Sequence, residues 1–257
     1  MAPGAGSDAP YHLEWRDGLA VVHLTCGKAN ALNPRTLAAI ERALDEARAG
    51  DARGLVLTGY DRFFSARLDL VALYGLERGA MDEFMARFDA VMLRVFAYPR
   101  PVVAALTGHA VAGGGILGLA CDARVMGAAA GRFGLNEIRL GVPFPASALE
   151  IVRYSVPARS VEEVLYRGEL FDPRAALTHG LVTELVDGDV LEAARRTCDR
   201  LAAAPASAFE SIKGALKAPA VERAHATLEP LRRAFVDAWY APEARRRIGE
   251  ARVRLGG

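Results

Sequence analysis

A run of glycines between two apolar segments constrains this chain more than any other feature. Residues 107–117 read Thr-Gly-His-Ala-Val-Ala-Gly-Gly-Gly-Ile-Leu, between apolar runs at 101–106 and 117–121. The first run predicts a buried strand and the second predicts the start of a buried helix. Glycines let the backbone approach a ligand closely, and amides at a helix N-terminus attract negative charge. Such a turn can hold an oxyanion or a phosphate, although a tightly packed or flexible loop has the same sequence.

The segments before this turn predict an α/β fold. Residues 11–15 and 19–24 flank an Asp-Gly pair, which is a hairpin pattern. Asn33-Pro34 begins an amphipathic helix that ends at Gly50, and residues 54–58 form a short buried strand. Strand, helix and strand joined by short links predict a right-handed crossover and a mostly parallel sheet.

Two other segments lie where a parallel sheet collects ligands. Residues 61–70 (Asp-Arg-Phe-Phe-Ser-Ala-Arg-Leu-Asp-Leu) follow the strand at 54–58, as the glycine turn follows the strand at 101–106. Ligands gather at the carboxyl ends of parallel strands, so we expect both turns to face one pocket. The loop at 132–145 carries Glu137 between apolar neighbours. Most glutamates are solvated, but an apolar setting would raise the pKa of Glu137 and suit it to moving protons.

The composition favours one large domain and excludes several classes of partner. The chain has 257 residues, of which 52% are hydrophobic, and a net charge of +1, so no overall field recruits nucleic acid or a membrane surface. No apolar run approaches the roughly 20 residues of a membrane span. Three scattered cysteines lack metal-ligand spacing and fit a reducing compartment, so we expect a cytoplasmic protein without a metal. Residues 1–10 are expected to form a disordered lead rather than a signal peptide.

Three segments carry a family resemblance. Residues 64–70, 108–115 and 133–137 resemble, in order and spacing, the signature segments of the crotonase superfamily, the enoyl-CoA hydratases and isomerases. The likeness begins near Tyr11 and implies a spiral of repeated ββα turns over residues 11–200. It also implies a C-terminal helical region at 201–257 that forms a homotrimer, often paired into a hexamer. A basic helix at 243–254 is either a solvated face or, as in relatives, a contact for coenzyme A.

The resemblance also implies a ligand and a binding site. The substrate would be an acyl-CoA thioester used in fatty acid metabolism, with coenzyme A as part of the substrate and no separate cofactor. The backbone amides of Leu68 and Gly113 would stabilise the enolate oxygen, and one such donor contributes about 3–4 kcal/mol. The residues expected to contact the substrate or its coenzyme A part are Lys28, Ala29, Ala31, Ala66, Arg67, Leu68, Leu70, Gly113 and Gly114.

Carboxylates distinguish the reactions of this superfamily. Hydratases use two glutamates, and the first of these positions is occupied here by Ile116 and the second by Glu137. Ile116 cannot transfer a proton, so the two-glutamate hydration route is disfavoured. The pattern resembles the mitochondrial type of 3,2-trans-enoyl-CoA isomerase, in which one base moves a proton from C2 to C4. Glu137 would be that base, in a dry apolar surround.

One departure from the family pattern keeps alternatives open. Arg67 stands where the family usually has glycine, directly before a proposed oxyanion donor. If φ is positive there, the arginine costs about 1 kcal/mol or more and could tilt the next amide. If φ is ordinary, its guanidinium can reach a coenzyme A phosphate or the acyl pocket. A hydrolase or C–C cleaving enzyme would need a second polar group such as Asp69 or His109, although His109 is expected in the core or behind the site. The third alternative is a family member that only binds acyl-CoA or assembles with partners.

Overall fold

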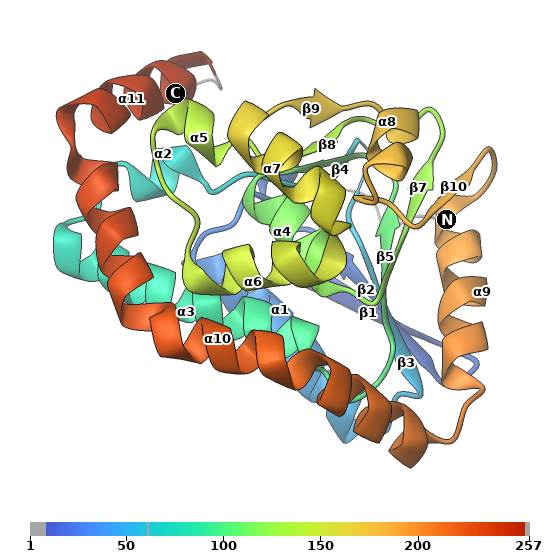
Figure 1. The fold of residues 1–257 in the computed structure, drawn as a ribbon. Helices are drawn as coiled ribbons and strands as arrows, with labels where there is room; N and C mark the ends of the chain where they lie inside the picture. Colours follow the sequence, from blue (N-terminus) through green and yellow to red (C-terminus); the bar gives the residue numbers. More distant parts are fainter. Residues whose placement is uncertain (1–8, 61, 255–257) are drawn as a thin grey trace.

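Two β-sheets form the framework of the structure, a computed structural model that describes residues 9–60 and 62–254 (Figure 1). The larger sheet has the strand order β1-β2-β3-β5-β7-β10 and the smaller sheet the order β4-β6-β8-β9. The strands of the larger sheet are β1 (Tyr11–Arg16), β2 (Leu19–Leu24), β3 (Gly54–Thr58), β5 (Val102–Leu106), β7 (Ala123–Gly127) and β10 (Glu184–Val186). Those of the smaller sheet are β4 (Phe63–Ala66), β6 (His109–Val111), β8 (Phe133–Gly134) and β9 (Leu170–Phe171).

A ββα unit repeats along the core. Each unit gives its first strand to the larger sheet and its second strand to the smaller one, and then forms a helix. The repeats are β3–β4 with α2 (Leu70–Leu73) and α3 (Arg78–Phe96), β5–β6 with α4 (Gly113–Ala120), and β7–β8 with α5 (Glu137–Leu140) and α6 (Ala146–Ser155). Neighbouring first strands pair in parallel, with Leu55 opposite Val102 and Val103 opposite Ala123. The expected spiral of ββα turns is therefore present.

The remaining helices flank this core. They are α1 (Pro34–Ala49), α7 (Ala158–Arg167), α8 (Pro173–Thr178), α9 (Val190–Ala202), α10 (Ala206–Tyr240) and α11 (Pro242–Arg254), with a short 3-10 turn at Lys28–Asn30. The expected hairpin at 11–24 forms β1 and β2, and Asn33 caps α1 by accepting a hydrogen bond from the Thr36 amide at 3.0 Å. The sequence-based predictions of this hairpin and of the start of α1 are therefore confirmed by the structure.

Three details differ from the sequence-based expectations. The segments 61–70 and 107–115 are not simple turns, because they contain β4 and β6. The ligand-facing turns therefore follow strands of the smaller sheet rather than those of the larger one. Residues 132–145 are likewise not one loop, since they contain β8 and α5. These strands have only two to four residues, which is too short for an alternating pattern to show in the sequence.

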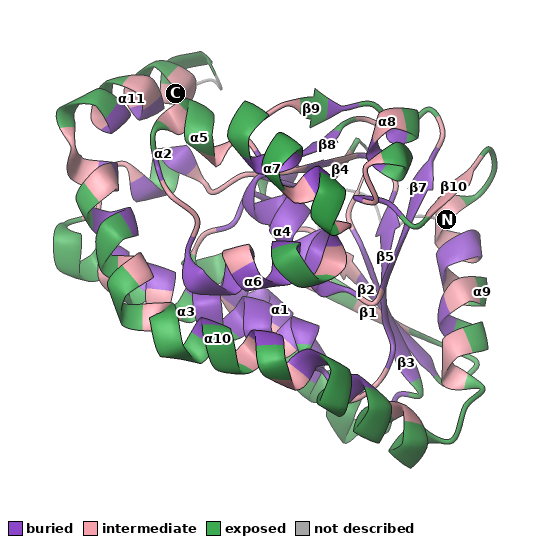
Figure 2. Ribbon diagram, in the orientation of Figure 1, coloured by how far each residue is buried: buried purple, intermediate pink, exposed green. Residues whose placement is uncertain are grey.

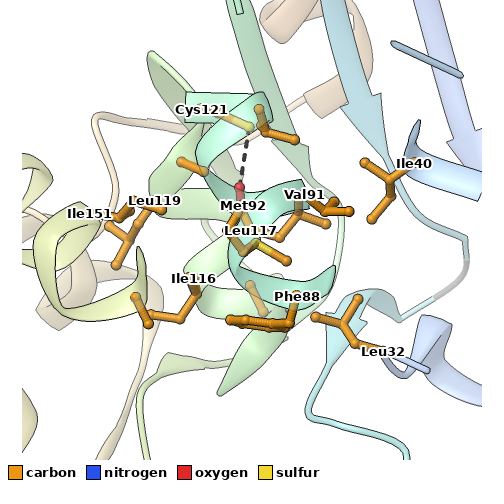
Figure 3. Packing of buried hydrophobic residues seen from close by; sticks show 14 of the residues in the cluster. Leu32, Ile40, Phe88, Val91, Met92, Ile116, Leu117, Leu119, Cys121 and Ile151 are labelled. Atoms are coloured by element: carbon orange, nitrogen blue, oxygen red, sulfur yellow. Dashed lines mark hydrogen bonds between the residues drawn. The ribbon is translucent and has the colours of Figure 1, made fainter. Parts of the chain in front are cut away.

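The core lies between the larger sheet and the helices of the spiral. The strands of that sheet are mostly buried, whereas the outer face of α10 is exposed (Figure 2). Near the turn after β6, Phe88 of α3 lies between Ile116 of α4 and Leu32 (Figure 3). Cys121 is buried at the end of α4 and donates a hydrogen bond to the Leu117 carbonyl. Phe88 and Ile116 form part of one wall of the site described below.

The last two helices, α10 and α11, pack against the helices of the core. α10 runs along α3 and α6, and α11 turns back to lie against α2 and α5 (Figure 1). No helix in the described part of the chain is both long and apolar enough to cross a membrane. Most of the expected disordered lead at 1–10 lies outside the described residues, which begin at residue 9.

Candidate active site

The turns after β4 and β6 bring two free backbone amides together. Leu68 forms a parallel bridge with Leu32, in which the Leu32 amide donates to the Arg67 carbonyl and the Asp69 amide to the Leu32 carbonyl, each at 2.9 Å. The Leu68 amide makes no hydrogen bond to any described residue. Gly113 is the first residue of α4, so its amide has no partner within the helix. A Cβ on Gly113 would lie 3.3 Å from Leu68 Cδ2, so the two residues are in contact.

The residue before each amide has an unusual backbone conformation. Arg67 has φ = 63°, and Ala112 has φ = 51° with ψ = −125°, regions that favour glycine. Each costs about 1–3 kcal/mol and persists only where the surroundings enforce it. Here the Arg67 amide donates to the Val111 carbonyl at 2.7 Å, and the Ala112 amide donates to the Gly134 carbonyl at 2.8 Å. Arg67 therefore adopts the strained conformation, and the Leu68 amide is nevertheless left without a protein acceptor.

Gly114 supports this arrangement from behind. A Cβ on Gly114 would lie only 1.9 Å from the Ser65 carbonyl oxygen, so α4 can approach β4 this closely only with glycine at that position. The Ser65 hydroxyl in turn donates to the Asn30 carbonyl at 2.8 Å. Gly114 therefore packs against β4 and does not line the cavity in front of the amides.

A cavity of about 770 Å³ lies in front of the two amides. Its walls include Ala66, Arg67, Leu68, Leu70 and Gly113, all of which the sequence indicated as substrate contacts. The apolar part of the wall comes from α3, α4, α6 and α10. Its side chains are Met85, Phe88, Ile116, Ala148, Phe235 and Trp239. A cavity of this size, with an apolar wall and a few polar groups, suits a small organic ligand.

Glu137 lies in the same cavity as the first residue of α5, three residues after β8 ends. Part of the residue reaches the surface, but its Oε2 atom is buried and has no hydrogen-bond partner among the described residues. Burial raises the pKa of Glu137 from 4.5 to about 7, although a hydrogen bond with its own backbone opposes the rise. A carboxylate with this pKa can both accept and return a proton near neutral pH.

Ile116 and His109 also line the cavity. His109 is therefore part of the cavity wall and not of the core, contrary to expectation, because it begins β6 and faces the same way as Val111. His109 Nδ1 accepts a hydrogen bond from the Arg132 amide at 3.1 Å. Desolvation and the charges of Arg62 and Arg132 lower the pKa of His109, which favours the neutral ring. His109 therefore presents a polar group, and no carboxylate among the described residues is paired with it.

A second, smaller cavity of about 370 Å³ adjoins the first at Arg67 and Leu70, which line both. Lys28 and Ala31 line the smaller cavity, as does Asp69. Asp69 caps α2 through the Ala72 amide (3.1 Å) and accepts a hydrogen bond from Asn33 Nδ2 (3.0 Å). It is therefore engaged in structure, outside the cavity that holds Glu137.

Ala29 lines neither cavity, unlike its expected neighbours Lys28 and Ala31. Its side chain is buried, and its amide donates to Tyr60 Oη at 2.9 Å. Ala29 lies within the short turn at Lys28–Asn30, but its φ of 63° and ψ of 19° are not helical and kink the turn. Ala29 therefore shapes the loop rather than the surface that a ligand meets.

Residues from the end of the chain complete the cavity. Arg246, Arg247, Glu250 and Arg254 of α11 line it, which agrees with the ligand-contact alternative for the basic tail. The aromatic wall from α3 and α10 was not foreseen in the sequence. Phe84 and Phe88 stand at helical spacing, but such a pattern does not show which cavity an apolar helix face meets.

Comparison with known proteins shows the family of this chain. The family model described as enoyl-CoA hydratase/isomerase matches residues 14–247. The chain belongs to this family. It is 36% identical over 180 residues to a Thermus thermophilus protein provisionally named an enoyl-CoA hydratase, which covers 68% of this chain and 70% of that one. It is also 32% identical over 183 residues to mouse mitochondrial enoyl-CoA delta isomerase 1, covering 70% of this chain and 63% of that one.

A solved structure confirms the fold of this family member. Human mitochondrial Δ3-Δ2-enoyl-CoA isomerase superimposes with a TM-score of 0.91 over 96% of this chain and 98% of the human chain, at 24% identity. The crotonase-like spiral expected from the three sequence segments is therefore confirmed. Relatives carry the names of both hydratases and isomerases, so the names agree on the enzyme family and differ on the reaction.

Proposed function

We propose that this enzyme shifts the double bond of a 3-enoyl-CoA to give the 2-trans-enoyl-CoA. The observation that carries the proposal is the pairing of one buried carboxylate, Glu137, with two free amides in a cavity where Ile116 occupies the other carboxylate position. An enzyme that deprotonates a carbon next to a thioester needs an oxyanion site and one base of pKa near 7.

The reaction uses Glu137 twice. The Glu137 carboxylate removes a proton from C2, and the electron pair moves onto the thioester oxygen to form a thiodienolate. The amides of Leu68 and Gly113 donate hydrogen bonds to that oxygen as its charge develops. The electrons then return through the conjugated system, and Glu137 delivers the same proton to C4. Atoms and charge balance without a second acid, a metal or a separate cofactor.

The rest of the cavity disfavours hydration. Among the described residues that line it, the carboxylates are Glu137 and Glu250. Glu250 is exposed on α11 and accepts a hydrogen bond from Arg246 Nη1 at 2.6 Å, so it is poorly suited to activating a water molecule. Ile116 is 1% exposed and adds an apolar surface. Water held at a single carboxylate would lack the second group that the two-glutamate route uses.

The test is a spectrophotometric assay of the purified protein with 3-hexenoyl-CoA and, in parallel, crotonyl-CoA. We expect conversion of the first and no hydration of the second. Glu137→Gln should lower the isomerisation rate at least about 10²-fold, since general acid–base groups contribute about 10²–10⁴-fold. It should leave binding of acyl-CoA largely intact.

Other outcomes would assign a different reaction. Hydration of crotonyl-CoA would replace the isomerase proposal with a hydratase, and undiminished turnover by Glu137→Gln would exclude the single-base mechanism. Inactivity with both substrates, with acyl-CoA still bound, would favour another superfamily reaction or a binding protein. Assembly into a homotrimer or hexamer stays a prediction, which sedimentation of the same preparation would test.

A further inference from the structure

Arg67 lies at the junction of the two cavities. It lines the 770 Å³ cavity that contains Glu137 and the 370 Å³ cavity that contains Lys28. It directly precedes Leu68, whose amide is one of the two free donors. Arg67 therefore belongs to the wall of both cavities and is adjacent in sequence to one of the amide donors.

The Arg67 guanidinium differs from those of the other arginines around the main cavity. Arg139 donates to the Gly168 carbonyl at 2.6 Å, Arg246 to Glu250 at 2.6 Å and Arg247 to Glu243 at 2.7 Å. Arg254 donates to the Glu250 carbonyl at 3.4 Å. The guanidinium of Arg67 makes no hydrogen bond to any described residue, although the residue is half-buried.

Burial without a partner is costly for a guanidinium. It carries five N–H donors and stays charged, so it needs acceptors wherever water is partly removed. Desolvation lowers the pKa of Arg67, and the charge of Asp69 opposes this. The Asp69 carboxylate already accepts hydrogen bonds from Asn33 Nδ2 and the Ala72 amide. The described residues therefore supply a nearby negative charge but no hydrogen bond to satisfy the donors.

The backbone of Arg67 adds a second cost. Its φ of 63° suits glycine, and the hydrogen bonds to Val111 and from Leu32 fix that conformation. Glycine would adopt the same backbone without strain. An arginine that is strained, half-buried and unpaired in the absence of a ligand is expected to gain its partner from the ligand.

We propose that Arg67 binds an anionic oxygen group of the substrate at the junction of the two cavities. Carboxylate and phosphate match the planar fork of a guanidinium. In a coenzyme A thioester such a group is either a phosphate of the coenzyme A part or a carboxylate on the acyl part. The choice of a thioester rests on the function proposed above, whereas the requirement for an anion rests on Arg67 itself.

Calorimetric titration of the full-length protein separates the two sources. Butyryl-CoA carries the phosphates, butyryl-pantetheine lacks them, and glutaryl-CoA adds a carboxylate to the acyl group. If Arg67 binds a phosphate, Arg67→Met should weaken the binding of butyryl-CoA at least tenfold and leave the binding of butyryl-pantetheine unchanged. If Arg67 binds an acyl carboxylate, the same variant should bind butyryl-CoA as the wild type does. Its affinity for glutaryl-CoA should fall at least tenfold.

Two further variants isolate the side chain from the backbone. Arg67→Gly removes the strain as well as the guanidinium, so it should lose the same affinity as Arg67→Met while its Tm rises. Arg196→Met on α9, outside both cavities, should bind all three ligands as the wild type does. Equal binding of every ligand by the wild type and Arg67→Met would overturn the proposal, as would an equal loss for all three.

The outcome does not depend on turnover. A wild-type protein that binds butyryl-CoA through Arg67 but converts no 3-enoyl-CoA would refute the isomerase and keep the role of Arg67. A protein that isomerises 3-hexenoyl-CoA and binds all ligands independently of Arg67 would support the isomerase and refute the role of Arg67.

Discussion

Glu137 shows how the needs of the reaction and of the fold oppose each other at a single residue. Its Oε2 atom is buried without a hydrogen-bond partner among the described residues, and burial raises its pKa to about 7. The native state therefore holds the proton more tightly than the unfolded chain, whose glutamates have a pKa near 4.5. The resulting stabilisation is present below pH 4.5 and is lost as the pH rises through 7.

Replacing Glu137 by Gln should thus change stability in a pH-dependent way. The shift of the pKa corresponds to about 3 kcal/mol that the wild type loses between pH 4 and pH 8. We expect Glu137→Gln to be more stable than the wild type by up to about 3 kcal/mol at pH 8, with the advantage shrinking toward pH 4. Urea denaturation at both pH values measures this difference.

Glu222→Gln on the exposed side of α10 is the matched control and should show little difference at either pH. A Glu137→Gln variant less stable than the wild type at pH 8 would mean that the charged carboxylate is well solvated in the native state. In that case the raised pKa, and the base assigned to Glu137, would both be wrong.

At this scale the sequence indicated the base and the two amide donors, but neither their geometry nor most of the apolar cavity wall. Glu137 and Gly113 stand out through an apolar loop and a glycine run, and both line the cavity. Leu68 has no such signal, because the group that matters is its amide and any side chain would allow it. The positive φ of Arg67 depends on a hydrogen bond to Val111 and one from Leu32, and both residues lie far from Arg67 in the sequence. Such long-range constraints are invisible to local patterns.

Among the elements, α11 connects the two halves of the site. On one side it meets α2, which begins two residues after Leu68, and on the other it meets α5, which begins with Glu137. Tyr74, after α2, contacts two guanidinium groups of α11, with Arg245 Cζ 3.6 Å and Arg252 Cζ 4.4 Å from its ring centroid. Toward α5, Arg247 Nη1 donates to the Arg139 carbonyl at 3.2 Å.

Loosening the contact at Tyr74 should open the cavity to water. Each cation–π contact contributes about 0.5–2 kcal/mol, so Tyr74→Leu should let α11 detach more often. We expect kcat/KM for 3-hexenoyl-CoA to fall about tenfold, and the pKa that governs its pH profile to move from about 7 toward the ordinary glutamate value as Glu137 is hydrated.

Tyr74→Phe keeps the ring and should retain wild-type activity within about twofold, because the Tyr74 hydroxyl makes no hydrogen bond to a described residue. A thermal melt of each variant separates loss of the contact from loss of the fold. An unchanged pH profile in Tyr74→Leu would show that α11 covers Glu137 without this contact.

The sequence predicted long elements better than short ones. The sequence predicts α1 from its cap at Asn33 and its apolar face, and β3 and β5 from continuous apolar runs. In contrast, the sequence predicts turns or loops where β4, β6 and β8 lie, since two to four residues cannot establish a period. The smaller sheet that carries both ligand-facing turns therefore emerged only from its pairing in three dimensions.

For the molecule as a whole, a buried charge cluster joins α10 to the spiral core. Asp122, just after α4, accepts hydrogen bonds from Lys213 Nζ at 2.6 Å, Lys217 Nζ at 2.7 Å and the Val102 amide at 2.8 Å. The lysine side chains are 6% exposed and that of Asp122 is 12% exposed. Desolvation lowers the pKa of Lys213 to about 8, although Asp122 opposes this. Two of the three lysines in the chain are therefore committed to one contact with the far end of the helix that begins at Gly113.

Removing the Asp122 charge should weaken the attachment of α10 to the core. In Asp122→Asn the amide is nearly the same size, but two buried ammonium groups lose their counter-charge, which costs about 3–5 kcal/mol for a buried pair. Asp199→Asn makes the same substitution in an exposed pair with Arg53 (2.8 Å), where a loss under about 1 kcal/mol is expected. Denaturant unfolding of both variants gives the comparison directly. If the two variants lost the same stability, the apolar contacts of α10 with α3 and α6 would hold the helix. The charge cluster would then orient α10 without stabilising it.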